Sequence, residues 1–127
     1  MIHHLCVGSG DIPRARRFYD AALGILGMRL LKQDDVGIHY GTGDIFFSVV
    51  RPTNGHDASA GNGVHIAFVA RNHPMVTAFY EAALRHGGRD AGAPGVRHQY
   101  APNYFGAFVF DPDGNKIEAV ALQSVVQ

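Results

Sequence analysis

Hydrophobic and polar positions along the chain follow the same succession of patterns twice. A short run with apolar residues at alternate positions, residues 2–7, precedes a segment whose apolar residues recur every three or four positions, residues 11–27. Alternation predicts a half-buried strand, and the longer period predicts an amphipathic helix packed against it. The same two patterns return at residues 64–70 and 72–88. Strand-like stretches follow each pair, so each half is predicted to be a β-α-β-β-β unit.

The two halves also match residue by residue. Residues 65–88 align with residues 4–27 at a constant offset of 61, and eight of the 24 paired positions are identical. Ordinary composition would give roughly one or two identities. The identical pairs are His4/His65, Pro13/Pro74, Phe18/Phe79, Tyr19/Tyr80, Ala21/Ala82, Ala22/Ala83, Leu23/Leu84 and Gly27/Gly88. A matched His, Pro and Phe-Tyr at fixed spacing indicates an internal duplication.

Local signals mark where the remaining elements begin and end. Asp11 and Asn72 are expected to cap the two helices, each followed by a proline in the first turn. Asp111-Pro112-Asp113-Gly114 predicts a β-turn. Further strands are expected at residues 28–33, 38–41, 45–51, 105–110 and 116–122, and a long loop with at most one short strand at 89–104.

These elements predict one domain that spans residues 1–127 and consists of two repeats. The first module would cover residues 1–51, a Pro/Gly/Asn/Ser-rich linker residues 52–63, and the second module residues 64–127. A unit of roughly sixty residues buries its apolar face poorly alone. The modules are therefore expected to pack together or against a second chain.

Composition excludes several classes of partner. Eleven basic residues balance eleven acidic ones without a basic stripe, which argues against nucleic acid and anionic membranes. Cys6 is the only cysteine, so no intrachain disulfide can form and a reducing compartment fits. The N-terminus lacks the pattern of a secretion signal, and no apolar run approaches the length of a membrane span. These features predict a cytoplasmic protein.

Three residues are candidate metal ligands. His4 and His65 occupy equivalent positions on the two first strands, and they can converge if the modules face each other. Glu118 lies in the final strand within an otherwise apolar run, and alternation directs it to the face that carries the histidines. A buried carboxylate needs a partner, and a divalent metal with two imidazoles is one. An arginine or water beside Glu118 is the structural alternative.

The repeat also predicts an asymmetry in this site. Aligning residues 114–120 with residues 43–49 places Phe47 opposite Glu118, while Ser48 is one residue off and would face the other way unless the strand bulges. A symmetric site would hold two histidines and two carboxylates. This chain would offer two histidines, one carboxylate and an apolar side formed by Phe47.

The duplicated βαβββ pattern, His4 placed seven residues before Asp11, and the closing FDPDGNKIEAV stretch resemble the vicinal oxygen chelate superfamily. This superfamily contains glyoxalase I, bleomycin-resistance proteins and extradiol dioxygenases. The resemblance covers nearly the whole chain. Within the superfamily, the sequence is most similar to a glyoxalase-like branch. It implies an α+β fold in which tandem βαβββ modules form a curved mixed sheet around a cup, usually in a homodimer.

The resemblance further implies that His4, His65 and Glu118 bind a divalent ion such as Zn, Ni, Fe(II) or Mn. Glyoxalase I has a glutamate ligand at the position assigned to Phe47, so this departure argues against lactoylglutathione isomerisation. Two histidines and one carboxylate instead match the ligand set of extradiol dioxygenases.

Residues 89–104 are the second functional candidate. Arg97 could hold a carboxylate or phosphate, and Tyr100, Asn103 and Tyr104 could line a small-molecule site together with Phe47. An ordinary surface loop is the structural alternative.

The leading hypothesis is a metal-dependent enzyme of the lyase or isomerase type, with vicinal substrate oxygens chelating the metal and Glu118 acting as ligand or base. An extradiol-type dioxygenase is the enzymatic alternative. A metal-free protein that sequesters drugs, and a scaffold without a ligand, are the others. The modules could pair within one chain or across a dimer.

Overall fold

The computed structural model describes residues 1–122, so residues 123–127 of the predicted second module lie outside the described part. The first half contains β1 (Leu5–Gly8), α1 (Ile12–Ile25), β2 (Arg29–Gln33), β3 (Gly37–Gly41) and β4 (Ile45–Val50). The second half contains β5 (His65–Val69), α2 (His73–Arg85), β6 (Arg89–Val96), β7 (Phe105–Phe110) and β8 (Lys116–Ala121). No helix within residues 1–122 is long and apolar enough to cross a membrane.

Each half folds into its own four-stranded mixed sheet. The strand orders are β1-β4-β3-β2 and β5-β8-β7-β6, and in each sheet the first and last strands of the module pair in parallel. The remaining neighbours are antiparallel. The predicted α+β fold of two tandem βαβββ modules is confirmed.

Both helices begin where the sequence predicts. The Asp11 side chain accepts a hydrogen bond from the Arg14 amide, and the Asn72 side chain accepts one from the Met75 amide. These caps satisfy backbone donors that the first turn of a helix leaves free. The two helices thus begin with equivalent caps, as the duplication predicts.

The prediction of a long loop at residues 89–104 is wrong for its first half, because β6 extends from Arg89 to Val96 and pairs with β7. The pairing shifts register around Gly92 and Gly95. Glycine and proline are depleted in strands and mark bulges, so the bulged strand has the composition of a loop.

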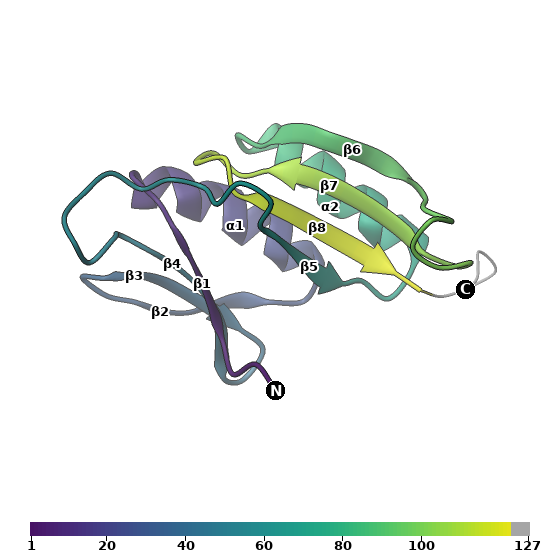
Figure 1. Ribbon diagram of the computed structural model, residues 1–127. Coiled ribbons are helices and arrows are strands. Elements are labelled where there is room, and N and C mark those ends of the chain that lie inside the picture. Colours follow the sequence, from purple (N-terminus) through teal and green to yellow (C-terminus); the bar gives the residue numbers. More distant parts are fainter. Residues whose placement is uncertain (123–127) are drawn as a thin grey trace.

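A single core joins the two modules back to back. Helix-facing residues of both sheets share one cluster, and the rings of Phe47 and Phe68, from different modules, meet edge to face with centroids 5.2 Å apart. Gly88 follows α2 where a Cβ atom would lie 2.7 Å from the Phe18 ring of α1. In Figure 1 both helices lie behind the β5–β8 sheet, with the β1–β4 sheet below it. The opposite face of each sheet therefore points away from this common core.

Residues of the turn between β7 and β8 form hydrogen bonds that connect the second module to the first. The Tyr19 hydroxyl, on α1, donates a 2.6 Å hydrogen bond to the Asp111 carboxylate. Asn115 donates to the Gly8 carbonyl at 3.0 Å, and Asp113 accepts from the Gly10 amide at 3.0 Å. Burial raises the pKa of Asp111, while hydrogen bonds from Tyr19 and Asn115 act to lower it. The turn motif thus has a structural role in joining the modules.

Removing the Tyr19 hydroxyl should weaken this junction. Tyr19→Phe keeps the ring but leaves a buried carboxylate without its phenolic donor, which should lower the free energy of unfolding by about 1–3 kcal/mol. Tyr80 is the repeat equivalent on α2, and its hydroxyl donates to Asp90 at an exposed site, so Tyr80→Phe is the matched control. Urea denaturation of both variants checks the difference. Equal losses would contradict a special role for the Tyr19–Asp111 bond.

Candidate functional site

The site begins with two side chains on neighbouring strands of the second module. In the β5/β8 register, His65 pairs with Lys116 and Ala67 pairs with Glu118, so alternation puts all four on one face. This is the face turned away from the core. His65 Nε2 lies 3.3 Å from Glu118 Oε1. The structure thus brings together two of the three predicted metal ligands.

Tyr104 holds the other oxygen of Glu118. Its hydroxyl donates a hydrogen bond to Oε2, and Gly106 makes room, since a Cβ atom there would lie 3.0 Å from that oxygen. Burial and then the hydrogen bond to Glu118 raise the pKa of Tyr104. The phenol therefore remains protonated as a donor, and it fixes the carboxylate in one orientation.

The remaining oxygen of Glu118 lacks a hydrogen-bond donor. The side chain is fully buried, and Oε1 has no hydrogen-bond partner within the described residues. The 3.3 Å approach of His65 is an ion-pair distance and does not meet hydrogen-bond geometry. A buried acceptor left unsatisfied is costly. An imidazole nitrogen beside an unsatisfied carboxylate oxygen fits a divalent cation as shared partner.

His4 does not complete this site within a single chain. It immediately precedes β1 and is exposed, and its ring contacts His3, with their Nδ1 atoms 2.9 Å apart. Among residues 1–122, no cluster of three or more His, Cys, Asp or Glu side chains could hold a metal ion. Convergence of all three predicted ligands in one chain is therefore not observed. Pairing across a dimer is the other arrangement predicted from the sequence.

The strand register corrects the predicted asymmetry. Leu5 pairs with Phe47 and its repeat mate Ile66 pairs with Ile117, so Phe47 is the counterpart of Ile117. Phe47 is fully buried in the core, packed against Tyr19 and Phe68, and not in the cup. The alignment that placed it opposite Glu118 was wrong by one residue, because the turn before β4 differs in length from the turn before β8.

Ser48 is the true counterpart of Glu118. Cys6 pairs with Ser48 as Ala67 pairs with Glu118. The Ser48 hydroxyl lies 2.7 Å from His39 Nδ1, and His39 Nε2 lies 3.1 Å from Asp34. The hydrogen bond to His39 lowers the pKa of Asp34. The sequence analysis missed this chain of polar groups, although Ser48 is the one polar residue of its strand.

The other predicted site residues separate into two groups. The Arg97 guanidinium lies 5.6 Å from the centre of the Phe108 ring, on the same sheet as Glu118. Tyr100 packs against Tyr104, with ring centroids 5.0 Å apart, although most of its side chain is exposed. Asn103 is exposed in the segment before β7. Arg97 and Tyr104 thus border the Glu118 site, and Tyr100 packs on Tyr104.

Comparison with known proteins agrees with this geometry. Residues 1–119 match the model of the Glyoxalase/Bleomycin resistance protein/Dioxygenase superfamily. The chain belongs to that superfamily. A glyoxalase/bleomycin resistance protein from Albidiferax ferrireducens T118 is 34% identical, with a TM-score of 0.90, over 95% of this chain and 98% of that one. No curated protein matches the chain.

More distant members of the superfamily share the fold alone. A glyoxalase-related enzyme from Fulvimarina pelagi is 20% identical, with a TM-score of 0.75, over 95% of this chain and 87% of that one. A V278E mutant of glyoxalase I from Zea mays is 23% identical, with a TM-score of 0.67. The match covers 94% of this chain and 45% of the maize chain.

The Tyr104–Glu118 contact can be tested by titration. The tyrosinate absorbance at 295 nm is recorded against pH for the parent and for Tyr104→Phe. The difference between the two curves reports Tyr104, and it should show a pKa above the ordinary tyrosine value of about 10. Glu118→Gln should move that component to lower pH, because a neutral amide no longer disfavours the phenolate. Far-UV circular dichroism at each pH verifies that the fold persists. A Tyr104 component at the ordinary pKa, unmoved by Glu118→Gln, would contradict the contact.

Proposed function

We propose that the protein is a metal-dependent small-molecule enzyme of the lyase or isomerase type, and that two chains complete each site. His65 and Glu118 of one chain would hold the ion together with His4 of the partner subunit. The observation that carries this proposal is the buried Glu118 oxygen, which lacks a hydrogen-bond donor and lies beside His65. Membership of the superfamily supports it.

The back-to-back arrangement supports a homodimer. Both outer sheet faces point away from the common core, so a second chain can cover them. Strands β1 and β5 are sheet edges, and both carry exposed apolar side chains, among them Leu5 and Val69, the latter 80% exposed. Unpaired strand edges with apolar side chains favour association with another chain. Pairing β1 of one chain near β5 of the other would bring the His4 and His65 positions together.

Each residue of the site has a separate task in this proposal. His65 and Glu118 Oε1 would bind the cation, and Tyr104 would keep Glu118 in position through Oε2. A bound divalent ion would supply a Lewis acid for vicinal oxygens of a substrate. A carboxylate that is not occupied as a ligand could instead take the substrate proton, so Glu118 is either ligand or base.

Ring-cleaving oxygenation is the second candidate. Ser48 occupies the position equivalent to Glu118, so the first module offers no carboxylate at that position. Two histidines and one carboxylate form the facial triad that suits Fe(II). The identity of the bound metal separates the candidates, since iron favours oxygenation and zinc or nickel favours isomerase or lyase chemistry.

Metal content provides the direct test. Protein purified without a histidine tag should contain close to one metal ion per chain by elemental analysis, and Glu118→Ala should lose it. Glu81→Ala removes an exposed carboxylate on α2 and is the control. A parent that contains no metal and takes up none on reconstitution would refute the metal-dependent function.

Mixed dimers test whether the site spans two chains. His4→Ala and Glu118→Ala chains should each lack metal alone. Unfolding and refolding them together creates dimers with one intact site, in which His4 comes from one chain and Glu118 from the other. A random mixture should recover about a quarter of the parent's metal. No recovery, despite heterodimers seen by native mass spectrometry, would place all ligands in one chain.

A further inference from the structure

Two cations flank one aromatic ring next to the Glu118 site. Lys116 Nζ lies 5.0 Å from the centre of the Phe108 ring, and the Arg97 guanidinium carbon lies 5.6 Å from it. The His65 ring approaches the same phenylalanine, with centroids 5.9 Å apart. Phe108 pairs with Glu118 across β7 and β8. The cations and the candidate metal ligands therefore share one surface.

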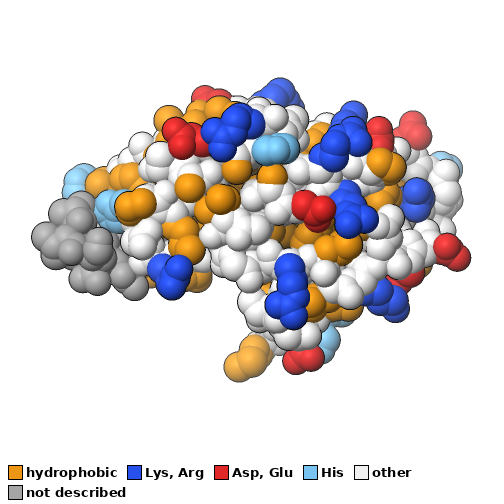
Figure 2. Space-filling view, turned by 180° about the vertical axis from the view of Figure 1, so that it is seen from behind, with side chains coloured by type: hydrophobic (Ala, Val, Ile, Leu, Met, Phe, Trp, Pro, Cys, Tyr) orange, Lys and Arg blue, Asp and Glu red, His pale blue; other side chains and the backbone are white. Residues whose placement is uncertain are grey.

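These cations are not neutralised by acidic side chains. Within the described residues, neither Arg97 nor Lys116 forms an ion pair, and both are only partly exposed. Arg89, over the neighbouring Phe110 ring, likewise has no ion pair in that part of the chain. Glu118 contributes one carboxylate to this surface, so the three cations leave it locally positive in a protein whose charges balance. The opposite face shows interspersed basic and acidic side chains (Figure 2).

The position of Arg97 is built into strand β6. A Cβ atom on Gly95 would lie 2.9 Å from Nη1, and one on Gly92 would lie 3.3 Å from Nη2. The guanidinium donates from Nη2 to the Ala93 carbonyl at 2.6 Å. Gly92 and Gly95, where the pairing of β6 is irregular, therefore leave space for the guanidinium to lie against the strand. This arrangement holds the cation in place before any ligand arrives.

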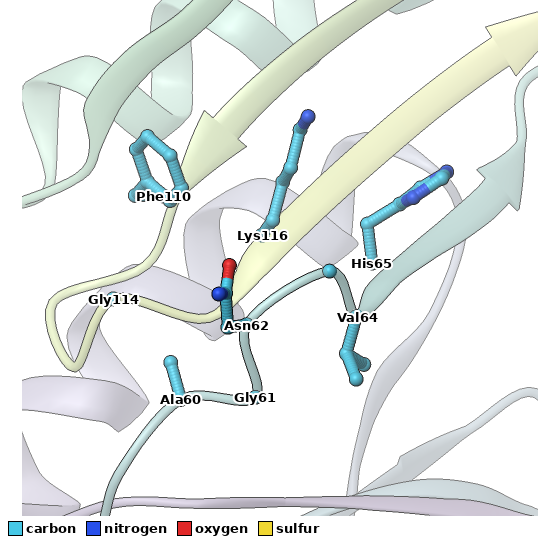
Figure 3. A pocket seen from close by; sticks show the side chains of 9 residues that line it. Ala60, Gly61, Asn62, Val64, His65, Phe110, Gly114 and Lys116 are labelled. Atoms are coloured by element: carbon cyan, nitrogen blue, oxygen red, sulfur yellow. The ribbon is translucent and has the colours of Figure 1, made fainter.

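A pocket of about 450 Å³ opens on the same side. His65 and Lys116 project from neighbouring strands in the same direction, with Phe110 across from Lys116 (Figure 3). The glycine-rich segment at residues 60–64 forms its other wall. The pocket is large enough for a small organic molecule. It offers a cation, an imidazole and an aromatic ring together.

We propose that this surface selects substrates that are small organic acids, with Lys116, which lines the pocket, holding the carboxylate and Arg97, on the other side of Phe108, adding to the positive charge that attracts it. Phe108 and Phe110 would contact the carbon skeleton beside it. The inference rests on the proposed function in one respect, because the reacting oxygens of the substrate would lie at His65 and Glu118. An anionic group held by unpaired, partly buried cations forms charge-assisted hydrogen bonds, which discriminate strongly against a neutral analogue.

The anion preference can be measured without any metal. Ion-free parent protein is titrated with benzoate and with benzamide, which differ in charge but hardly in shape, and binding is followed by ligand-observed NMR. We expect benzoate to bind about tenfold or more tightly than benzamide. Lys116→Met should remove most of this preference, and Arg97→Gln should remove part of it. Arg85→Gln, an equal change of charge at the exposed end of α2, should preserve it.

Two results would overturn the proposed anion preference. Equal binding of benzoate and benzamide by the parent would refute it, as would a preference that survives in the double variant. Thermal unfolding of each variant shows whether a loss of binding reflects a loss of fold. Should a variant unfold, Arg97→Lys provides a milder change, which should weaken benzoate binding while retaining some preference.

A second arm separates this inference from the proposed metal function. The zinc-loaded protein is titrated with catechol and with 3,4-dihydroxybenzoate, which has the same vicinal oxygens and an added carboxylate. The inference expects tighter binding of the acid, reduced to the affinity of catechol in the Arg97→Gln, Lys116→Met double variant. Selective benzoate binding by a protein that takes up no zinc would support the anion site and refute the metal function.

Discussion

The buried hydrogen bond from Tyr19 to Asp111, together with the apolar core that both modules share, fixes how the two halves of the molecule pack on each other. It connects a helix of one module to the turn of the other, and Asn115 and Asp113 add bonds from the same turn to the backbone before α1. Polar groups inside a core are satisfied in only a few arrangements, so such bonds specify one packing among many that apolar contacts alone would permit. Back-to-back modules follow, and with them the outward direction of both functional sheet faces.

Strand alternation then separates two kinds of residue along the same strands. On β8, Ile117 and Ala119 enter the common core while Lys116 and Glu118 face outward. On β4, Phe47 enters the core while Ser48 faces outward. Adjacent residues of one strand thus point in opposite directions, one side chain into the core and the next toward the outer face. This explains why a buried carboxylate can sit in an apolar run without disturbing the packing between the modules.

Much of this could be predicted from the sequence, because the duplication supplies its own internal alignment. The caps at Asp11 and Asn72, the two modules, and the approach of His65 to Glu118 followed from spacing and period. Three features did not follow. A glycine-rich bulged strand has the composition of a loop, so β6 was expected only as a short strand within residues 89–104. A one-residue error in aligning the two final strands, whose preceding turns differ in length, reversed the roles of Phe47 and Ser48. Packing between modules depends on long-range contacts that periodicity does not encode.

The placement of Ser48 has a consequence for how easily this scaffold could change its chemistry. Ser48 is the structural twin of Glu118, yet its neighbours in the strand, Phe47 and Val49, carry the packing. A different side chain at this single position would alter the donor set offered by the first module and leave the shared core untouched. Duplication has therefore given the fold two equivalent outward-facing positions, Ser48 and Glu118, that can change separately. Divergent reactions within one family can then arise by replacing outward-facing residues one at a time, without rebuilding the protein that holds them.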